Sequence, residues 1–207
     1  MSAESARHDK DGTPHGEFAA YIDQCRQWHG LAPTSETKIF HSVKYVNASP
    51  NRLFPLMNCR IEGDDIRGQF FWMTWTNCVL TKIDLSHTGG VAHWTRVQFE
   101  NVTFHHLMAK VSAAQTVFRA CNFNNIVLEQ PVFLQCKFVK CKISGALIGA
   151  MFIDCEFEDV DLKGSRWEDP KTLDIRGTWK NAEQMWETSS PKAKAFFLRK
   201  PIEAVST

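Results

Sequence analysis

The sequence predicts an all-β solenoid built from four-sided coils, and two periodicities carry that prediction. The first is a recurrence of large apolar residues every five positions in the second half of the chain, at Phe118, Phe123, Leu128, Phe133, Phe138, Ile143 and Ile148. A helix repeats every 3.6 residues and a strand every two, so a period of five indicates a chain that turns a corner every five residues. Four such edges make one square coil.

The second periodicity is the coil itself, because the same residue types return every 19 or 20 positions. One column consists of Ile61, Leu80, Phe99, Phe118, Phe138 and Phe157. Another consists of Ile66, Leu85, Phe104, Phe123, Ile143 and Leu162. Six matches in each of two columns predict about six coils with these side chains stacked inside. A coil of 19 residues needs one shortened corner, which we expect at 71 to 75, 109 to 113 and 148 to 152.

The repeat resembles a known family. Stretches such as Cys121-Asn-Phe123-Asn-Asn and Val160-Asp-Leu162-Lys-Gly are similar to the A-(D/N)-L-x-x unit of pentapeptide-repeat proteins. The resemblance covers roughly residues 54 to 168, with Cys, Val or Ile where the family usually has Ala. It implies a right-handed quadrilateral β-helix with coils about 4.8 Å apart. It also implies a protein that acts mostly through interactions.

The segments outside the coils are predicted to be a tail and two caps. Residues 1–15 are polar and are predicted to be a disordered tail. Residues 16–53 are predicted to be an N-terminal helix and an irregular cap, because Phe18, Ile22 and Cys25 lie near helical spacing before Gly30. Residues 54–168 are predicted to form the β-helix. Residues 169–207 are predicted to be a C-terminal helical cap or arm, with two short helices between 179 and 199 that Ser-Ser-Pro separates.

Composition limits the class of partner. The 207 residues include 24 Lys+Arg and 23 Asp+Glu, a net charge of +1. A near-zero charge disfavours a basic nucleic-acid binder and an acidic nucleic-acid mimic, so we expect no nucleic-acid partner. The acidic run at 154–161 is expected to be a solvated face, since lysines lie beside it. Without an apolar run long enough to span a bilayer or a signal core, we expect no membrane partner and a cytoplasmic location.

Seven cysteines without CxxC pairs predict neither a disulfide framework nor a zinc site. Three pairs stack one coil apart, Cys59 with Cys78, Cys121 with Cys141, and Cys136 with Cys155. We expect them to be reduced packing groups. His87 and His106 also stack at a corner, but the sequence suggests no third ligand, so no metal is predicted. The sequence contains no cofactor-binding motif, so we expect no cofactor.

The outward positions on the two edges that flank the shortened corner are apolar. They are Phe70, Trp72, Met108, Val127, Leu147, Val132, Leu134, Met151 and Ile153. A contiguous apolar exterior marks a protein interface, a groove for an apolar small molecule, or a surface covered by another part of the chain. The terminal helices are the candidates for such a cover. These three explanations remain open at the level of sequence.

Three polar residues lie near that exterior and are the candidate catalytic groups. His93, Lys110 and Glu129 project outward from the same two edges, where a His, a Lys and a carboxylate could perform acid–base chemistry if they converged. A lone outward His is nevertheless more often solvated than catalytic.

Two functions from different classes follow. The first is a non-catalytic interaction scaffold that binds a protein partner, or a second copy of the chain, through the apolar outer face. The alternative is a cofactor-independent cyclase or isomerase of specialised metabolism, with a pocket for an apolar small molecule between the β-helix exterior and the terminal helices.

Overall fold

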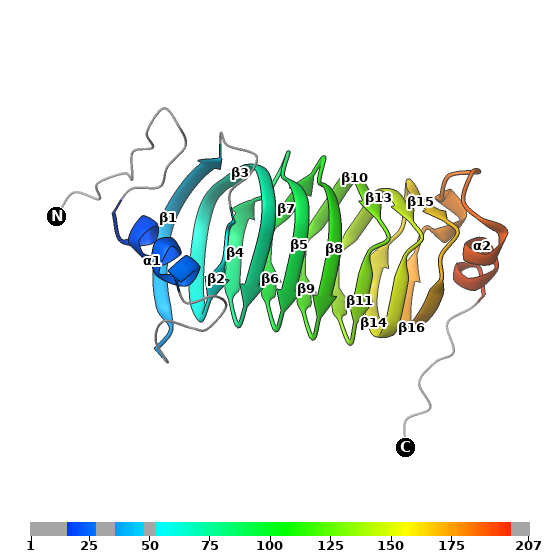
Figure 1. The fold of residues 1–207 in the computed structure, drawn as a ribbon. Helices are drawn as coiled ribbons and strands as arrows, with labels where there is room; N and C mark the ends of the chain where they lie inside the picture. Colours follow the sequence, from blue (N-terminus) through cyan, green and yellow to red (C-terminus); the bar gives the residue numbers. More distant parts are fainter. Residues whose placement is uncertain (1–15, 28–35, 48–52, 200–207) are drawn as a thin grey trace, which may run out of the picture.

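The protein is a rod of stacked strands with a short helix at each end (Figure 1). A computed structural model describes residues 16–27, 36–47 and 53–199. The strands are β1 (Lys38–Asn47), β2 (Leu56–Met57), β3 (Cys59–Thr76), β4 (Val79–Asp84), β5 (Gly89–Thr95), β6 (Gln98–Glu100), β7 (Thr103–His105), β8 (Met108–Ala114), β9 (Val117–Arg119), β10 (Asn122–Glu129), β11 (Val132–Leu134), β12 (Lys137–Val139), β13 (Lys142–Ile148), β14 (Met151–Asp161), β15 (Ser165–Glu168) and β16 (Thr172–Lys180). The helices are α1 (Gly16–Gln27), the 3-10 helix η1 (Ala182–Gln184) and α2 (Pro191–Phe197).

All the strand pairs are parallel, and they form a solenoid of about seven turns. Successive coils pair at an offset of 19 to 21 residues, as in Leu80 with Phe99 and Phe118 with Phe138. The predicted all-β solenoid with terminal helices is confirmed. The ladder also extends beyond the expected range of 54 to 168, because β1 pairs with β3 and β16 pairs with β14.

The corners are marked by left-handed backbone at regular intervals. One corner column has positive φ at Asn58, Asn77, Arg96, Gln115, Gln135 and Asp154. A single residue in this conformation turns the chain from one edge of the coil onto the next, and Asn tolerates it better than most residues do. The repeated turn chemistry therefore produces the flat edges between corners.

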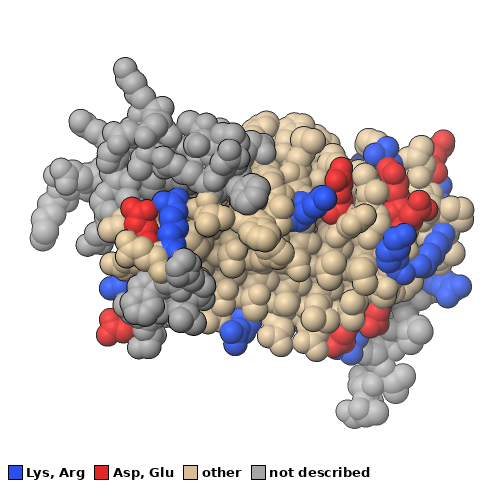
Figure 2. All heavy atoms as spheres, viewed as in Figure 1, with Lys and Arg blue, Asp and Glu red and all other residues tan. Residues whose placement is uncertain are grey.

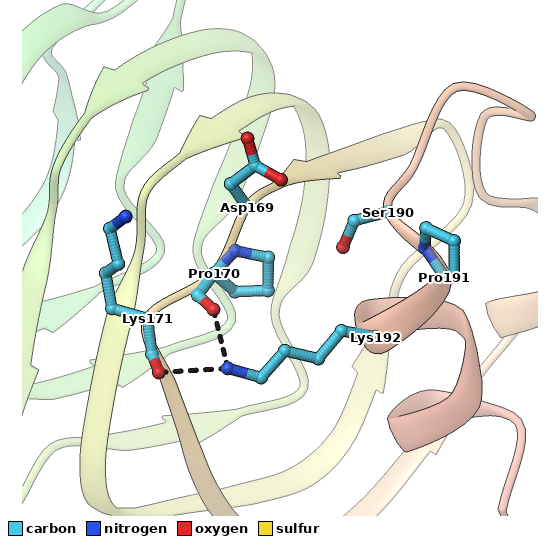
Figure 3. A pocket seen from close by; sticks show the side chains of 6 residues that line it. All are labelled: Asp169, Pro170, Lys171, Ser190, Pro191 and Lys192. Atoms are coloured by element: carbon cyan, nitrogen blue, oxygen red, sulfur yellow. Dashed lines mark hydrogen bonds between the residues drawn. The ribbon is translucent and has the colours of Figure 1, made fainter.

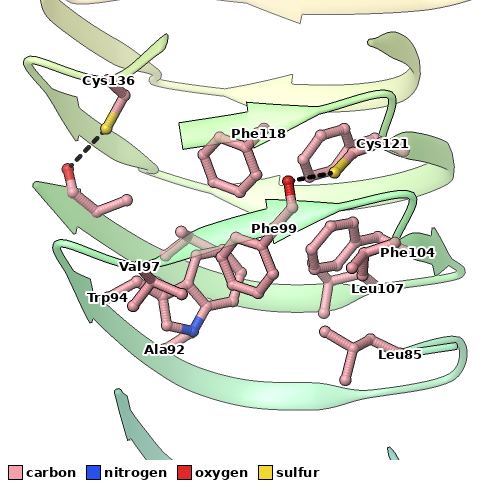
Figure 4. Close-up of a cluster of buried hydrophobic side chains, with 14 of the residues drawn as sticks. Leu85, Ala92, Trp94, Val97, Phe99, Phe104, Leu107, Phe118, Cys121 and Cys136 are labelled. Atoms are coloured by element: carbon pink, nitrogen blue, oxygen red, sulfur yellow. Dashed lines mark hydrogen bonds between the residues drawn. The ribbon is translucent and has the colours of Figure 1, made fainter. Parts of the chain in front are cut away.

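The interior is filled by aromatic stacks that follow the predicted columns. The rings of Phe99 and Phe118 are 5.1 Å apart and 5° from parallel, and those of Phe118 and Phe138 are 4.7 Å apart. Trp94 packs edge-on against Phe99 at 4.9 Å (Figure 4). All four side chains are almost fully buried. No room remains inside the coil for a ligand of useful size, so binding must involve the exterior or the ends.

The helices cover the two ends of this core. On α1, Phe18 contacts Phe40 and Phe54 at ring distances of 5.0 and 6.4 Å. On α2, Phe197 packs 4.7 Å from Trp167. A solenoid needs such caps because its terminal coils would otherwise expose apolar side chains. Helices α1 and α2 therefore pack against the terminal coils of the rod.

The C-terminal segment differs in part from the prediction. Trp179 belongs to β16, and its indole N–H donates to the carbonyl of Phe197 at 2.7 Å. Of the two short helices predicted, the first is a single 3-10 turn. The second begins after Ser190, whose hydroxyl accepts from the backbone N–H of Ala193, with Pro191 in the first turn. The predicted tail at 1–15, the residues from Trp28 to Gly30 and the end of the chain after residue 199 lie outside the described residues.

The shortened corner is where predicted at 109 to 113 but not elsewhere. There β8 runs straight through the corner, with Ala109, Val111 and Ala113 buried and the residues between them exposed or half-buried. In β3 the register shifts between Phe70 and Trp72, so that coil has an extra residue. In the two following coils the chain turns at this corner through a residue with left-handed backbone, Gln130 in one coil and Gly149 in the next.

Candidate binding surface

One edge of the solenoid presents apolar side chains outward in two parallel columns. Val132 pairs with Met151, and Leu134 pairs with Ile153, while Phe133 and Phe152 between them point into the core. Leu134 is 40% exposed, and the other three are half-buried. Ala114 on β8 extends the second column by one rung. We call these five residues, Ala114, Val132, Leu134, Met151 and Ile153, the apolar edge.

The rim of the apolar edge is polar. At one corner Gln115 donates from its side-chain amide to Gln135 at 3.3 Å. The opposite corner carries the exposed residues Glu129 and Gln130. In Figure 2, uncharged side chains cover most of the middle of the rod, a few charged side chains interrupt them, and more charged side chains gather toward the C-terminal end. An apolar centre with a polar rim is the usual anatomy of a protein interface.

Three more predicted residues lie near but apart from this edge. Met108, 64% exposed, and half-buried Val127 stack on the neighbouring edge of the coil. Trp72, 42% exposed, lies on an earlier coil with its ring 5.4 Å from that of His93. The side chain of Phe70 lies outside the described residues, although its backbone pairs with Gly90. The left-handed corner residue Gln130 separates Val127 from Val132, whereas Met108 and Ala114 lie on one continuous strand.

Leu147 is wrong as an outward residue. It is 1% exposed and lies in the inward column between Leu128 and Trp167. Its neighbour Ala146 takes the outward position in register with Val127. The assignment failed by one residue because the coil is shortened at a corner other than the one expected.

The observed shortening lies between Ile143 and Gly145, not at 148 to 152. Phe123 pairs with Ile143, whereas Ile126 pairs with Gly145, so this coil has one residue fewer at that corner. Gly145 has φ +103, and a Cβ there would lie 2.2 Å from the Ile126 carbonyl oxygen. Only glycine permits this approach, and this lone glycine was the signal in the sequence that the corner had moved.

The three candidate catalytic residues lie on three different strands, with Lys110 and Glu129 directly after the paired residues Ala109 and Leu128. His93 is half-buried on β5, Lys110 is exposed on β8, and Glu129 is exposed at the end of β10. No hydrogen bond or ion pair joins any two of them among the contacts that the structure describes.

His87, His105 and His106 form a cluster, of which the sequence predicted only the His87–His106 pair. The rings of His87 and His106 stack at 5.1 Å as predicted, and His105, not foreseen, lies 3.9 Å from His106. Asn124 contacts Nδ1 of His105 at 3.0 Å. Local desolvation, followed by the neighbouring imidazoles of His105 and His87, lowers the pKa of the exposed His106. Among the described residues, no group of three or more His, Cys, Asp or Glu is arranged to hold a metal ion.

The acidic run at 154–161 begins at the corner residue Asp154 and passes a second corner at Asp159, and cations lie beside it. Lys137 contacts Glu156 at 3.2 Å and Glu158 at 3.3 Å. Arg176 contacts Asp154, and Lys180 contacts Asp159 at 2.8 Å. We call the outward side chains of β12, of the second half of β14 and of β16 the charged edge. Its carboxylates are locally neutralised, unlike a row of phosphates.

The seven cysteines are free and buried. Stacking brings Sγ of Cys59 to 3.4 Å from Sγ of Cys78. Cys121 donates instead to the carbonyl of Phe99 at 3.5 Å (Figure 4). Burial raises the pKa of the Cys121 thiol, with a further contribution from Cys141. A buried thiol with a raised pKa packs as a small apolar group.

One open hollow of about 440 Å³ lies at the C-terminal end of the rod, lined by Asp169, Pro170, Lys171, Ser190, Pro191 and Lys192 (Figure 3). Lys192 donates from Nζ to the carbonyls of Pro170 and Lys171 at 2.8 and 3.0 Å. This amine ties α2 to the preceding turn. The hollow has a mixed polar and apolar lining and contains none of the predicted apolar residues.

Comparisons with known proteins add little. No family model matches the chain, and no curated protein matches its sequence. A solved structure of QnrB1, described as a plasmid-mediated fluoroquinolone resistance protein, covers 72% of this chain and 92% of its own at 13% identity, with a TM-score of 0.24. No helix among the described residues is long and apolar enough to cross a membrane.

Proposed function

We propose that this protein is a non-catalytic scaffold that binds a protein partner through the apolar edge. The observation that carries the proposal is the in-register placement of Val132, Leu134, Met151 and Ile153 on the outside of a regular parallel sheet. Outward side chains on such a sheet do not stabilise the core, yet here they are large, apolar and adjacent. A contiguous patch of this kind on a surface is typical of an interaction site.

The fold supports this role because it holds the patch rigidly. β11 is bonded along both sides, to β8 and β14, and its inward Phe133 stacks on Phe152 at 4.7 Å. The outward columns are therefore preorganised, which limits the ordering cost of binding. The candidate catalytic residues share no comparable arrangement.

Photo-cross-linking in the cells that make the protein tests the proposal. A benzophenone amino acid replaces Leu134 on the apolar edge, and in a matched chain it replaces half-buried Val117 on the edge that carries β6, β9 and β12. We expect a discrete protein adduct from position 134 and none from position 117. Adducts from 117 alone, or no adduct at 134, would contradict the proposal.

A further inference from the structure

The size and hydrogen bonding of the apolar edge restrict what can occupy it. We infer that its partner presents an amphipathic α-helix, laid on the two outward columns of β8, β11 and β14 with its apolar stripe toward Leu134 and Ile153. This inference rests on the proposed function and names the kind of partner.

Backbone pairing excludes the addition of a strand at this place. β11 pairs with β8 on one side and with β14 on the other, and the first part of β14 pairs further with β16. No sheet edge is therefore open there, and an extended peptide has no ladder to join. An occupant must bind through side chains, which leaves a helix or the face of another sheet.

The area favours the helix. Three strands about 4.8 Å apart, carrying two outward columns about 7 Å apart, make a patch of roughly 200 Å². A stable dimer or protein pair buries roughly 800 Å² on each partner, several times this patch. A single helix, about 10 Å wide with a pitch of about 5.4 Å, covers the patch with about three turns. A second copy of the chain would gain too little from this edge alone.

The neighbouring surface limits the patch to this size. Toward the C-terminus, Met151 is followed in its column by Thr172, and Asp174 accepts a hydrogen bond from the backbone N–H of Asp154. Toward the N-terminus, Val132 is preceded by Ser112 and then by His93. Val127 lies beyond the left-handed corner residue Gln130, and on β8 the exposed Lys110 and Ser112 separate Met108 from Ala114. Polar residues thus limit the apolar edge to a width that matches the apolar face of one helix.

Few charged side chains lie beside the apolar edge, which also favours a helix whose binding face is uncharged. Lys110 and Glu129 lie on one side of it, while Gln115 and Gln135 form the other side. The polar flanks of an amphipathic helix would meet these side chains. Specificity would then come from the rim, and affinity from the apolar columns.

Fluorescence anisotropy with two synthetic peptides tests this inference. The probe is a labelled peptide of about 18 residues, long enough to form a helix, with Leu on one face, Gln elsewhere and equal numbers of Glu and Lys. Its control has the same composition with the Leu residues spread around the helix. We expect micromolar binding of the amphipathic peptide and at least tenfold weaker binding of the control.

Matched variants of the protein locate the binding. Leu134→Gln/Ile153→Gln should weaken binding of the amphipathic peptide at least tenfold. Val79→Gln/Val117→Gln, which alters two half-buried outward valines on another edge, should change it less than twofold. If the first variant fails to fold, Val132→Thr/Ile153→Thr keeps β-branched side chains on the same edge and should show the same loss.

Equal binding of both peptides, no binding, or an equal loss in both double variants would overturn the inference. Sedimentation of the wild type adds another decisive outcome. A dimer that Leu134→Gln/Ile153→Gln converts to monomer would make a second copy the occupant and would also overturn it. A protein adduct at position 134 in cells, together with failure of the peptide, would reject the helix while leaving the proposed function intact.

Discussion

β14 carries two different surfaces on one continuous strand. Its first residues, Met151 and Ile153, belong to the apolar edge, and its later residues, Glu156 and Glu158, belong to the charged edge. Both halves bury similar aromatic residues, Phe152 and Phe157, in the same core. The strand therefore gains its stability from the inward column, whereas the outward residues alone differ between the edges.

This difference shows how a solenoid separates stability from recognition. Each inward residue stacks on its equivalents in the coils above and below, so the core tolerates little change. An outward residue meets only its neighbours on one edge, and each edge acquires its own chemistry. Changes to the core should disturb both edges together, and changes to one edge should leave the other unaltered.

The largest effect is expected when the shared core is broken. Phe138→Ala removes a ring that is 1% exposed and stacks on Phe118 at 4.7 Å. We expect the free energy of unfolding to fall by about 3 to 5 kcal/mol, measured by urea denaturation. Leu134→Ala on the apolar edge is the control and should cost less than about 1 kcal/mol. Equal costs would contradict the separation of core from edge.

A corner that only glycine can form should come next. Gly145→Ala would place a Cβ 2.2 Å from the Ile126 carbonyl oxygen at φ +103, and should cost more than about 2 kcal/mol. Gly63 also has positive φ, +64, but a Cβ there meets nothing within 4 Å. Gly63→Ala should therefore cost only about 1 kcal/mol. Similar melting temperatures for the two variants would mean that the close approach at Gly145 does not exist.

A smaller effect is expected on the charged edge. Lys137→Met removes the cation between Glu156 and Glu158, all of whose side chains are more than a third exposed. Exposed ion pairs contribute little, so we expect a loss of about 0.5 to 1 kcal/mol that shrinks in high salt. Peptide binding at the apolar edge should not change. A loss that persists in 1 M salt would argue for a packing role of the Lys137 stem instead.

The smallest expected effect is the pH dependence of the stability that the Lys137 ion pairs contribute. Hydrogen bonds to Glu156 and then Glu158 raise the pKa of Lys137 above its usual value of 10.5. A raised pKa in the folded state gives stability that is fully present below about 10.5 and is lost as the pH rises through the folded value. The difference in melting temperature between wild type and Lys137→Met should therefore narrow between pH 9 and pH 11.5. A constant difference would show that the lysine acts without its charge.

The inward columns could be predicted from sequence because packing demands the same residue at every coil. Phe99, Phe118 and Phe138 repeat so regularly that their stacking followed from spacing alone. Prediction weakened at the last coil, where Gly177 takes the place of Phe157 in the column. A Cβ at Gly177 would lie 1.9 Å from the Phe157 carbonyl oxygen, so the close approach of the two backbones requires glycine at this position. The column therefore has no apolar residue there from which the sequence could predict a further coil.

The outer surface was harder to predict because a shift of one residue reverses which way a side chain points. Burial alternates from Val132 to Leu134 and from Met151 to Ile153, so the outward positions of these residues followed from their spacing. Leu147 follows the irregular corner at Gly145, and its direction was therefore missed. The approach of His105 to His87 and His106 also depended on corner geometry, which spacing alone does not give.

The most direct test is native mass spectrometry of the protein purified from its own cells. Three forms should be compared: wild type, Leu134→Gln/Ile153→Gln, and Val79→Gln/Val117→Gln. The account predicts that the wild type and the second variant retain a bound protein and that the first variant loses it while remaining folded. A bound small molecule in place of a protein, or the same complex in all three forms, would contradict the claim that the apolar edge is a protein-binding surface.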